Sequence, residues 1–308
     1  MSEHSPRPRS FATKSLDQQH IDYLDQLDRD LTENPFNYYS HLALVTTLHQ
    51  GFQNHLASID SSPHDYELVH ILRDAYRAMS DKYPLGETLW HYRLNDEKIL
   101  ARSSEERMGV LELHKQATHE EPYSAKLWAA YGEYVSYLVA CSWEQVPPEE
   151  WSEEDRLIGR ELFQPQLLTE VLQQGAERVK YNLQESNLVW DRYLQVLEED
   201  LERTGLSQEK VTRIASIYNE RLGLPHATWS HTRSRYISFI QRYNLGDPEQ
   251  VNEQVTQKNT HIIQQCANRE DYEFKVLQAI QQGDQNAEYH AITPVSYTHL
   301  TLPTILRV

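Results

Sequence analysis

The sequence has only two cysteines, Cys141 and Cys266, which lie 125 positions apart. Two thiols at that spacing form neither a CxxC metal-ligand pair nor a disulfide framework, so we expect a reducing compartment. Apolar runs long enough to span a membrane, about 18 residues or more, are also missing. Residues 1–15 are polar and lack the apolar core of a signal peptide, which argues against secretion.

Basic residues are few as well. Lys and Arg number 29 against 46 Asp and Glu, which gives a formal net charge of −17 at pH 7. Affinity for nucleic acid depends on neutralising phosphates with Lys and Arg, and the densest basic stretch here is Arg7-Pro8-Arg9. The chain by itself is therefore a poor candidate for binding RNA or DNA. A protein partner with a basic surface is the electrostatically compatible kind.

Motifs for catalysis and for cofactor binding are lacking. The sequence contains no G-x-S-x-G nucleophile elbow, no GxxxxGK[ST] phosphate loop and no GxGxxG dinucleotide loop. Among 15 histidines, His114 with His119 and His226 with His231 are five apart, whereas a helical zinc pair needs i, i+4 spacing. Cys141 is interpreted as a structural thiol. We therefore expect no enzyme activity, no metal and no cofactor.

Glycines are also scarce, at 10, and apolar residues recur at three- and four-residue intervals through most of the chain. This periodicity predicts amphipathic helices with one apolar stripe. Asn34-Pro35 and Asp247-Pro248 each place a capping side chain before a proline, and Ser152 to Asp155 is similar to a capping box. The predicted fold class is therefore all-α. The clearest stripes are Ile21, Leu24, Leu27 and Leu31; Leu68, Ile71, Leu72, Ala75, Tyr76 and Met79; and Val211, Ile214, Ala215, Ile217, Tyr218 and Leu222.

Four tryptophans indicate that these helices repeat. They fall early in amphipathic stretches, at spacings of 38, 62 and 39: Trp90, Trp128, Trp190 and Trp229. The long interval contains an acidic segment at about 143–160, with two consecutive prolines and six acids between Glu144 and Asp155. If roughly 24 of its residues are an insertion, the interval shortens to the common period of about 38. That period fits a pair of helices, and stacked antiparallel pairs form an α-solenoid.

Residues that follow the tryptophans share their helix face. Trp128 and Trp190 are each followed three positions on by tyrosine. Further along the same helices, Trp90 is followed by Glu97, Trp190 by Glu198 and Trp229 by Tyr236, at spacings of seven, eight and seven positions. Because i, i+3 and i+7 lie on one side of a helix, these side chains are predicted to pack between helices. In so acidic a chain, this core role is favoured over a stacking platform for nucleobases. The predicted structural positions of the repeat are Trp90, Glu97, Trp128, Tyr131, Trp190, Tyr193, Trp229 and Tyr236.

Three prolines precede these tryptophans, at Pro84, Pro122 and Pro225. Each is expected to end one helix and begin the turn into the next, because proline lacks the backbone N–H that continues a helix. Trp190 has no such proline.

These features together resemble the half-a-TPR (HAT) repeat of RNA-processing scaffolds, in which a helix with Trp-x-x-Tyr precedes a helix closed by proline. Within that family the chain is similar to the type called squamous cell carcinoma antigen recognised by T cells, and to its fungal counterparts, the U4/U6 small-nuclear-RNA annealing factors. The resemblance covers roughly residues 20–245, although Arg93 and Thr232 stand where the motif has tyrosine. The stretches that carry it are Asn34 to Tyr39, Leu72 to Met79, Tyr83 to Glu97 and Arg221 to Pro225.

The resemblance implies a nuclear, non-enzymatic scaffold that binds proteins of spliceosomal or other RNA-processing complexes, most specifically in U4/U6 ribonucleoprotein assembly or recycling. It further implies that RNA is contacted only through domains absent from this fragment, that no membrane is involved, and that a homodimer forms, if at all, through later repeats. Alternatives are a HAT scaffold of mRNA 3′-end cleavage or of another splicing complex, and a TPR-like co-chaperone adaptor. The adaptor's carboxylate clamp needs inward Lys, Arg and Asn, which the net charge disfavours.

The predicted organisation has four parts: a disordered N-terminal tail at 1–18, a HAT-repeat solenoid at 19–285, a linker at 286–294, and a segment at 295–308. Within the acidic insertion at about 143–160, residues 144–155 are interpreted as a solvated loop, and a docking site there would take a basic protein. The last segment begins Val-Ser-Tyr-Thr-His-Leu-Thr-Leu-Pro-Thr, which matches a translated transposase-end sequencing adapter. We expect the natural protein to depart from this sequence near Pro294.

Overall fold

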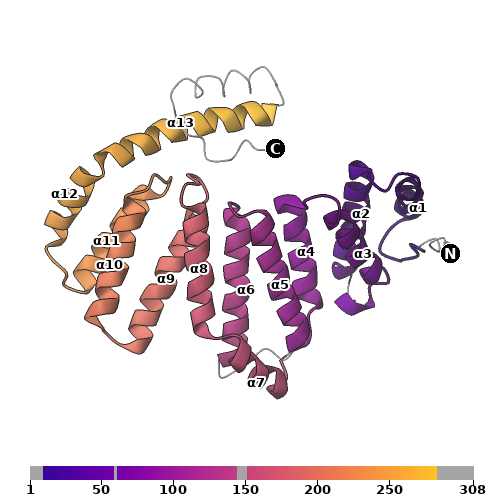
Figure 1. Ribbon diagram of the computed structural model, residues 1–308, viewed down its shortest axis with the longest axis horizontal. Helices are drawn as coiled ribbons and strands as arrows, with labels where there is room; N and C mark the ends of the chain where they lie inside the picture. Colours follow the sequence, from indigo (N-terminus) through magenta and orange to yellow (C-terminus); the bar gives the residue numbers. More distant parts are fainter. Residues whose placement is uncertain (1–9, 59–60, 144–150, 283–308) are drawn as a thin grey trace. The chain divides into compact units, whose positions relative to one another are not determined.

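The computed structural model describes residues 10–58, 61–143 and 151–282. These residues form thirteen α-helices, one short 3-10 helix and no strand (Figure 1), which confirms the predicted all-α fold class. None of the helices in this part of the chain is both long and apolar enough to cross a bilayer. Contacts between helices divide the described residues into two compact units. Unit 1 runs to Glu121 and includes 151–155, and unit 2 comprises the others from Pro122 onward.

Unit 1 is built from helices that pack on their neighbours in sequence. α1 packs on α2, α2 on α3, and α4 on α5. The predicted stripes supply its core, since Leu24 and Leu27 of α1 and Leu72 and Met79 of α3 are buried. Its elements are α1 (Gln18–Glu33), α2 (Tyr38–Leu56), the 3-10 helix η1 (Pro63–Asp65), α3 (Val69–Ser80), α4 (Gly86–Leu100) and α5 (Ser104–Glu120).

Residues 10–17 differ from the predicted disordered tail. Phe11 and Leu16 are buried, the Thr13 hydroxyl donates to Glu67 at 2.8 Å, and the Asp17 carboxylate accepts from His20 N as the N-cap of α1. Burial of the Phe11 and Leu16 side chains offsets the cost of ordering this stretch and folds it onto unit 1. Residues 1–9 lie outside the described part.

Unit 2 has the arrangement of an α-solenoid, as predicted. α6 packs on α8, and from α8 to α13 each helix packs on the next one in sequence, so that these helices bury apolar residues against their neighbours. α13 returns along the loops of the same unit, where Cys266 Sγ lies 3.6 Å from the His226 carbonyl (Figure 1). The helices that lie wholly in unit 2 are α6 (Ala125–Trp143), α8 (Pro165–Val179), α9 (Asn187–Thr204), α10 (Gln208–Leu222), α11 (Trp229–Arg242), α12 (Pro248–Lys258) and α13 (Thr260–Gln282). Helix α7 (Glu153–Leu162) is divided: its first three residues belong to unit 1 and the others to unit 2.

Two glycines allow α6 and α8 to approach closely. A Cβ atom added to Gly175 of α8 lies 3.0 Å from the Trp128 ring, and one added to Gly132 of α6 lies 2.7 Å from Leu172 Cδ2. Real Cβ atoms essentially never come nearer than 3.0 Å to such a neighbour and seldom nearer than 3.4 Å, so the close approach of the two helices depends on these glycines.

The predicted helix signals are confirmed at most positions. Asp247 caps α12 with Pro248 as its first residue, and Asp155 N donates to Ser152 Oγ at 3.0 Å at the start of α7. The three prolines that precede tryptophans all lie in loops between helices. The exception is Asn34-Pro35, which was predicted to open a helix. Asn34 instead ends α1, its side chain accepts from Phe36 N in a turn, and Asn37 is the N-cap of α2.

The acidic insertion is a helix over part of its length. Residues 153–162 form α7, so the interpretation of 144–155 as a solvated loop is wrong for residues 153–155. The helix forms because the Ser152 cap is followed by three consecutive acids in its first turn, where negative charge is favourable. Residues 144–150, with both prolines, lie outside the described residues, as do the linker at 286–294 and the adapter-like segment at 295–308.

Candidate protein-binding surface

The four motif tryptophans lie in the seams between helices. In unit 2 each indole N–H donates to a backbone carbonyl: Trp128 to Pro122 at 3.0 Å, Trp190 to Ala176 at 3.0 Å, and Trp229 to Leu222 at 2.8 Å. In unit 1 Trp90 donates to the Glu120 carboxylate at 2.8 Å. The four side chains are only 2–6% exposed, so their rings are not accessible for stacking on nucleobases.

The residues three positions after the tryptophans contact the same rings. Tyr131 stacks on Trp128 and Tyr193 packs edge-on against Trp190, with ring centroids 6.2 and 6.3 Å apart. Where the motif is broken, Arg93 places its guanidinium 5.4 Å from the centroid of the Trp90 ring. Its amphipathic stem and flat head thus occupy the place of a tyrosine.

Thr232, the other departure from the motif, is buried. Its hydroxyl lies 3.0 Å from His226 Nε2. His226 Nδ1 lies 2.8 Å from the Leu224 carbonyl, which can only accept. The neutral ring with its proton on Nδ1 therefore satisfies both contacts, with the threonine hydroxyl donating to Nε2. Burial, together with the smaller effect of the nearby Arg221 cation, lowers the pKa of His226 to about 3.

The predicted positions seven or eight residues after tryptophan connect neighbouring helices. Glu97 of α4 accepts two parallel hydrogen bonds from Arg73 of α3, at 2.8 and 2.6 Å, and these raise the pKa of the arginine. Glu198 of α9 accepts from the Tyr218 hydroxyl at 2.5 Å. The Tyr236 hydroxyl of α11 accepts from the Asn219 amide at 2.8 Å. Bidentate and charge-assisted contacts of this kind fix the register of paired helices.

Two buried polar groups were not predicted as a site. The Arg221 guanidinium of α10 is fully buried, 5.1 Å from the Trp190 ring centroid, and donates to Ser186 Oγ at 2.8 Å. Burial lowers its pKa to about 9. In unit 1 Asp96 contacts His49 Nδ1 at 2.8 Å and accepts from Tyr76 at 3.3 Å, and burial raises its pKa. Sequence periodicity carries no signal for such pairs, because their members lie on different helices.

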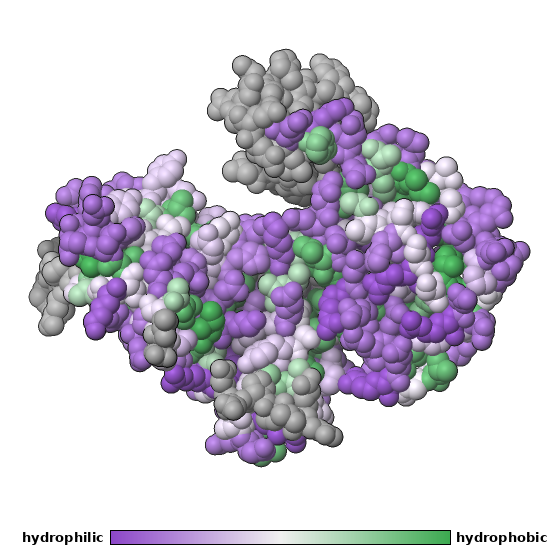
Figure 2. Space-filling view, turned by 180° about the vertical axis from the view of Figure 1, so that it is seen from behind, coloured by the Kyte–Doolittle hydropathy of each residue, from purple (hydrophilic) through white to green (hydrophobic). Residues whose placement is uncertain are grey.

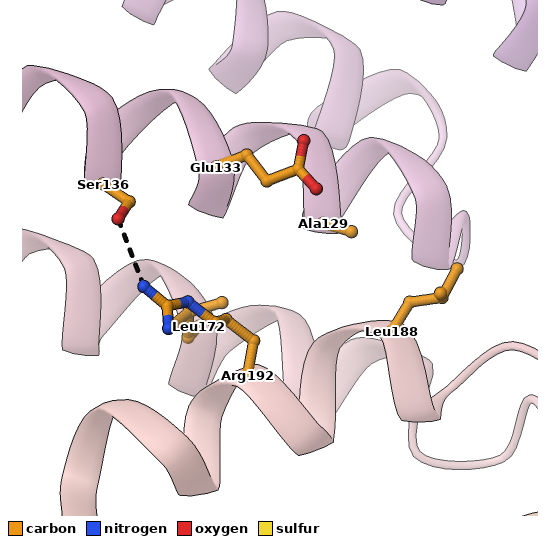
Figure 3. A pocket seen from close by; sticks show the side chains of 6 residues that line it. All are labelled: Ala129, Glu133, Ser136, Leu172, Leu188 and Arg192. Atoms are coloured by element: carbon orange, nitrogen blue, oxygen red, sulfur yellow. Dashed lines mark hydrogen bonds between the residues drawn. The ribbon is translucent and has the colours of Figure 1, made fainter. Parts of the chain in front are cut away.

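Since packing occupies the motif side chains, the surface available to a partner lies on the outward faces of the helices. In unit 2 α6 and α9 are in contact above α8, and between them is a hollow of about 350 Å³ (Figure 3). Leu172 of α8 lies at its floor and Leu188 of α9, 44% exposed, at one end. The hollow is lined by Ala129, Glu133, Ser136, Leu172, Leu188 and Arg192.

The charges around this hollow are asymmetric. Arg192 donates to Ser136 Oγ at 3.2 Å, as drawn in Figure 3, and lies 3.4 Å from Glu199. Glu133 is exposed, and no ion pair or hydrogen bond engages its carboxylate among the described residues. An apolar floor with one unpaired carboxylate at its edge is suited to a side chain with an apolar stem and a cationic head.

Three further features of the described residues concern metal-binding groups, thiols and the hydropathy of the surface. No group of three His, Cys, Asp or Glu in the described residues is placed to hold a metal ion. Cys141 is buried and Cys266 is partly buried, and neither forms a disulfide. Hydrophilic residues cover most of the face in Figure 2, and hydrophobic ones occur there in small separate groups. Contact by several small patches on successive helices is the mode that such a surface offers.

Comparison with known proteins gives a weak but extended similarity. No protein-family model matches the chain. Spliceosome associated factor 3, U4/U6 recycling protein, is 22% identical in Pongo abelii and in Homo sapiens, and 21% identical in Mus musculus. Each alignment covers 268 residues, which is 87% of this chain and 23% of the relative. The chain thus spans about a quarter of the length of these relatives, and its similarity to a splicing factor accompanies a helical architecture compatible with HAT repeats.

Proposed function

We propose that this chain is a non-enzymatic protein-binding scaffold in pre-mRNA splicing, in the assembly or recycling of the U4/U6 ribonucleoprotein. One observation carries the proposal: unit 2 uses the repeat positions to pack its helices and leaves the α6–α9 face, with its hollow and the unpaired Glu133, open to a partner. The choice of the U4/U6 ribonucleoprotein as the complex rests on the similarity to the U4/U6 recycling proteins. The expected compartment is the nucleus.

The proposed partners are proteins. With a net charge of −17 the chain repels RNA, so RNA is expected to be reached through bound proteins or through other domains. Catalysis has no supporting constellation in the residues discussed above, and its absence from this chain remains part of the proposal.

The geometry of the hollow argues against the co-chaperone alternative. A clamp for a peptide carboxylate needs free cationic and amide donors, whereas Arg192 is already engaged by Ser136 and Glu199, and Glu133 would repel the ligand. A HAT scaffold of the 3′-end cleavage machinery has the same architecture as a splicing scaffold. The proteins and RNAs that co-purify with the chain distinguish these two functions.

The test is affinity capture of the tagged chain from a nuclear extract of its own organism, with U1, U4 and U6 small nuclear RNAs quantified in the eluate. We expect U4 and U6 to be enriched several-fold over U1. Leu188→Glu at the hollow should reduce this enrichment, and Leu206→Glu, which alters a 76% exposed leucine elsewhere in unit 2, should not. Equal recovery of all three RNAs, or enrichment of cleavage factors instead, would refute the U4/U6 assignment.

A further inference from the structure

Helix α7 presents its apolar residues to solvent. Leu157, Ile158 and Leu162 are 60%, 40% and 44% exposed, while Arg156 and Gly159 of the same helix are buried. An amphipathic helix on a soluble domain normally turns the other way, with its apolar stripe inward. The orientation of α7 therefore leaves its apolar stripe without a partner in the described structure.

Contacts at the C-terminal end of α7 fix this orientation within unit 2. Arg160 Nε donates to the Ser142 carbonyl at 3.0 Å, and the Phe163 side chain, directly after the helix, is fully buried. The Phe163 carbonyl in turn accepts from Trp143 Nε1 at 3.0 Å. The Trp143 indole, 47% exposed, thereby lies at the end of α7 and extends its apolar surface.

We call Trp143, Leu157, Ile158, Glu161 and Leu162 the α7 patch. On a helix, Leu157 and Leu162 bound an arc of about 140° that also holds Glu161 and Ile158. Glu161 is exposed, and none of the described residues forms an ion pair with it. The patch is thus an apolar ridge with an unpaired carboxylate within it.

We propose that the α7 patch docks a basic amphipathic helix of a protein partner. The Leu and Ile side chains match the apolar stripe of such a helix, and its Lys or Arg stems can lie along the ridge with their heads at Glu161. Glu153 and Glu154, exposed in the first turn of α7, add to the negative potential around this helix. The patch does not overlap the α6–α9 hollow, so the proposal stands independently of the splicing role.

Charge also favours a basic helix over the other ligands that an apolar ridge could bind, which are membranes, nucleic acids and a second copy of this chain. Anionic membranes and nucleic acids are repelled by an acidic helix on a chain of net charge −17. A second copy would set α7 against α7 and bring like charges together, since a two-fold interface pairs each patch with itself. A basic helix alone gains from both the apolar ridge and the carboxylate.

The test measures binding of fluorescent amphipathic peptides to the full 308-residue chain by anisotropy. The probe is a Leu/Lys peptide of roughly 14 residues, long enough to cover α7, and its Leu/Glu counterpart is the charge control. At about 150 mM salt, where long-range attraction is screened, we expect binding of the Leu/Lys peptide only. The double variant Leu157→Ser/Ile158→Ser should weaken it about tenfold or more, and Glu161→Lys should weaken it as well.

Two matched controls separate docking from diffuse attraction. Leu206→Ser removes a leucine that is 76% exposed, more than Leu157 or Ile158, and Glu253→Lys makes the same charge change on α12. Both variants should bind the peptide as the parent chain does. The proposal is overturned if Glu253→Lys weakens binding as much as Glu161→Lys, or if neither peptide binds. It is also overturned if light scattering shows a dimer that the double variant dissociates, because a second copy then occupies the patch. Circular dichroism of each variant verifies that it is folded.

Discussion

Single residues hold the helices together through polar contacts inside apolar seams. The indole of Trp190 donates to the Ala176 carbonyl, and the cation of Arg221 lies on its ring. The indole hydrogen bond satisfies a buried N–H and a buried carbonyl, and an unsatisfied buried polar group costs about 1–3 kcal/mol. The proposal that the eight motif positions stabilise the repeat therefore has a direct test at the level of one side chain.

Trp190→Phe is predicted to lower the free energy of unfolding by about 2–4 kcal/mol, because it leaves a cavity, an unpaired carbonyl and a less favourable surface under Arg221. Trp143→Phe removes the same type of hydrogen bond, to the Phe163 carbonyl, from a side chain that is 47% exposed. Its cost should stay below about 1 kcal/mol, since water replaces the lost partner. Urea unfolding followed by circular dichroism measures both. Equal losses would contradict a seam role for Trp190.

His226 gives unit 2 a defined pH dependence. Its pKa in the folded chain is about 3 and the ordinary value is 6.5. Between these values the unfolded chain binds a proton that the folded chain does not, so stability falls as the pH is lowered below about 6.5, by about 1.4 kcal/mol per pH unit. His226→Gln can keep the contacts to Leu224 and Thr232 and should remove this part of the slope.

The measurement is urea unfolding at several pH values between 4 and 7, for the parent chain and the variant. His231→Gln is the matched control, because His231 is exposed and water surrounds it in both states. If the parent chain and His226→Gln lose stability in parallel as the pH falls, the buried neutral histidine is not the cause.

At the scale of helices, close packing competes with intrinsic propensity. Gly175 lies inside α8, where alanine is normally favoured by about 0.5–1 kcal/mol, but an added Cβ comes within 3.0–3.1 Å of Trp128. That ring cannot easily yield, since it is buried and hydrogen-bonded to the Pro122 carbonyl. Overpacking a rigid seam costs about 1–3 kcal/mol.

We therefore predict that Gly175→Ala is destabilising. Gly109 lies in the exposed middle of α5, and nothing lies within 4 Å of a Cβ added there. Gly109→Ala is therefore predicted to stabilise the folded chain by about 0.5–1 kcal/mol. In thermal melts, the midpoint of unfolding should fall for Gly175→Ala and rise for Gly109→Ala. A gain of stability in both would mean that α6 and α8 can move apart at little cost.

At the scale of the whole molecule, net charge limits the partners. A chain with 46 acids and 29 bases is predicted not to bind a single-stranded RNA of about 20 nucleotides at protein concentrations up to about 100 μM and about 150 mM salt. Gel-shift titration tests this. Binding that weakens steeply with added salt would reveal a local basic surface and would contradict a purely protein-directed scaffold.

Much of the fold was predictable because its signals are local. The all-α class follows from apolar periodicity, and Trp90, Trp128, Trp190 and Trp229 do lie in the first half of helices α4, α6, α9 and α11. A stripe, a cap or a proline acts within one or two turns, so the sequence alone contains what is needed to place these helices.

The remaining features depend on contacts between residues that are distant in sequence. Asn34 is equally able to cap a helix or close a turn, and only packing around α2 selects Asn37 as the cap. The apolar stripe of a helix is normally buried, yet the contacts of Arg160 and Phe163 turn that of α7 outward. The contact of Arg221 with Trp190 and the hollow between α6 and α9 likewise exist only once the helices are stacked. The sequence by itself thus determined which segments are helical, and the tertiary structure decided which face each presents, because burial energy belongs to the assembled surfaces and not to any one segment.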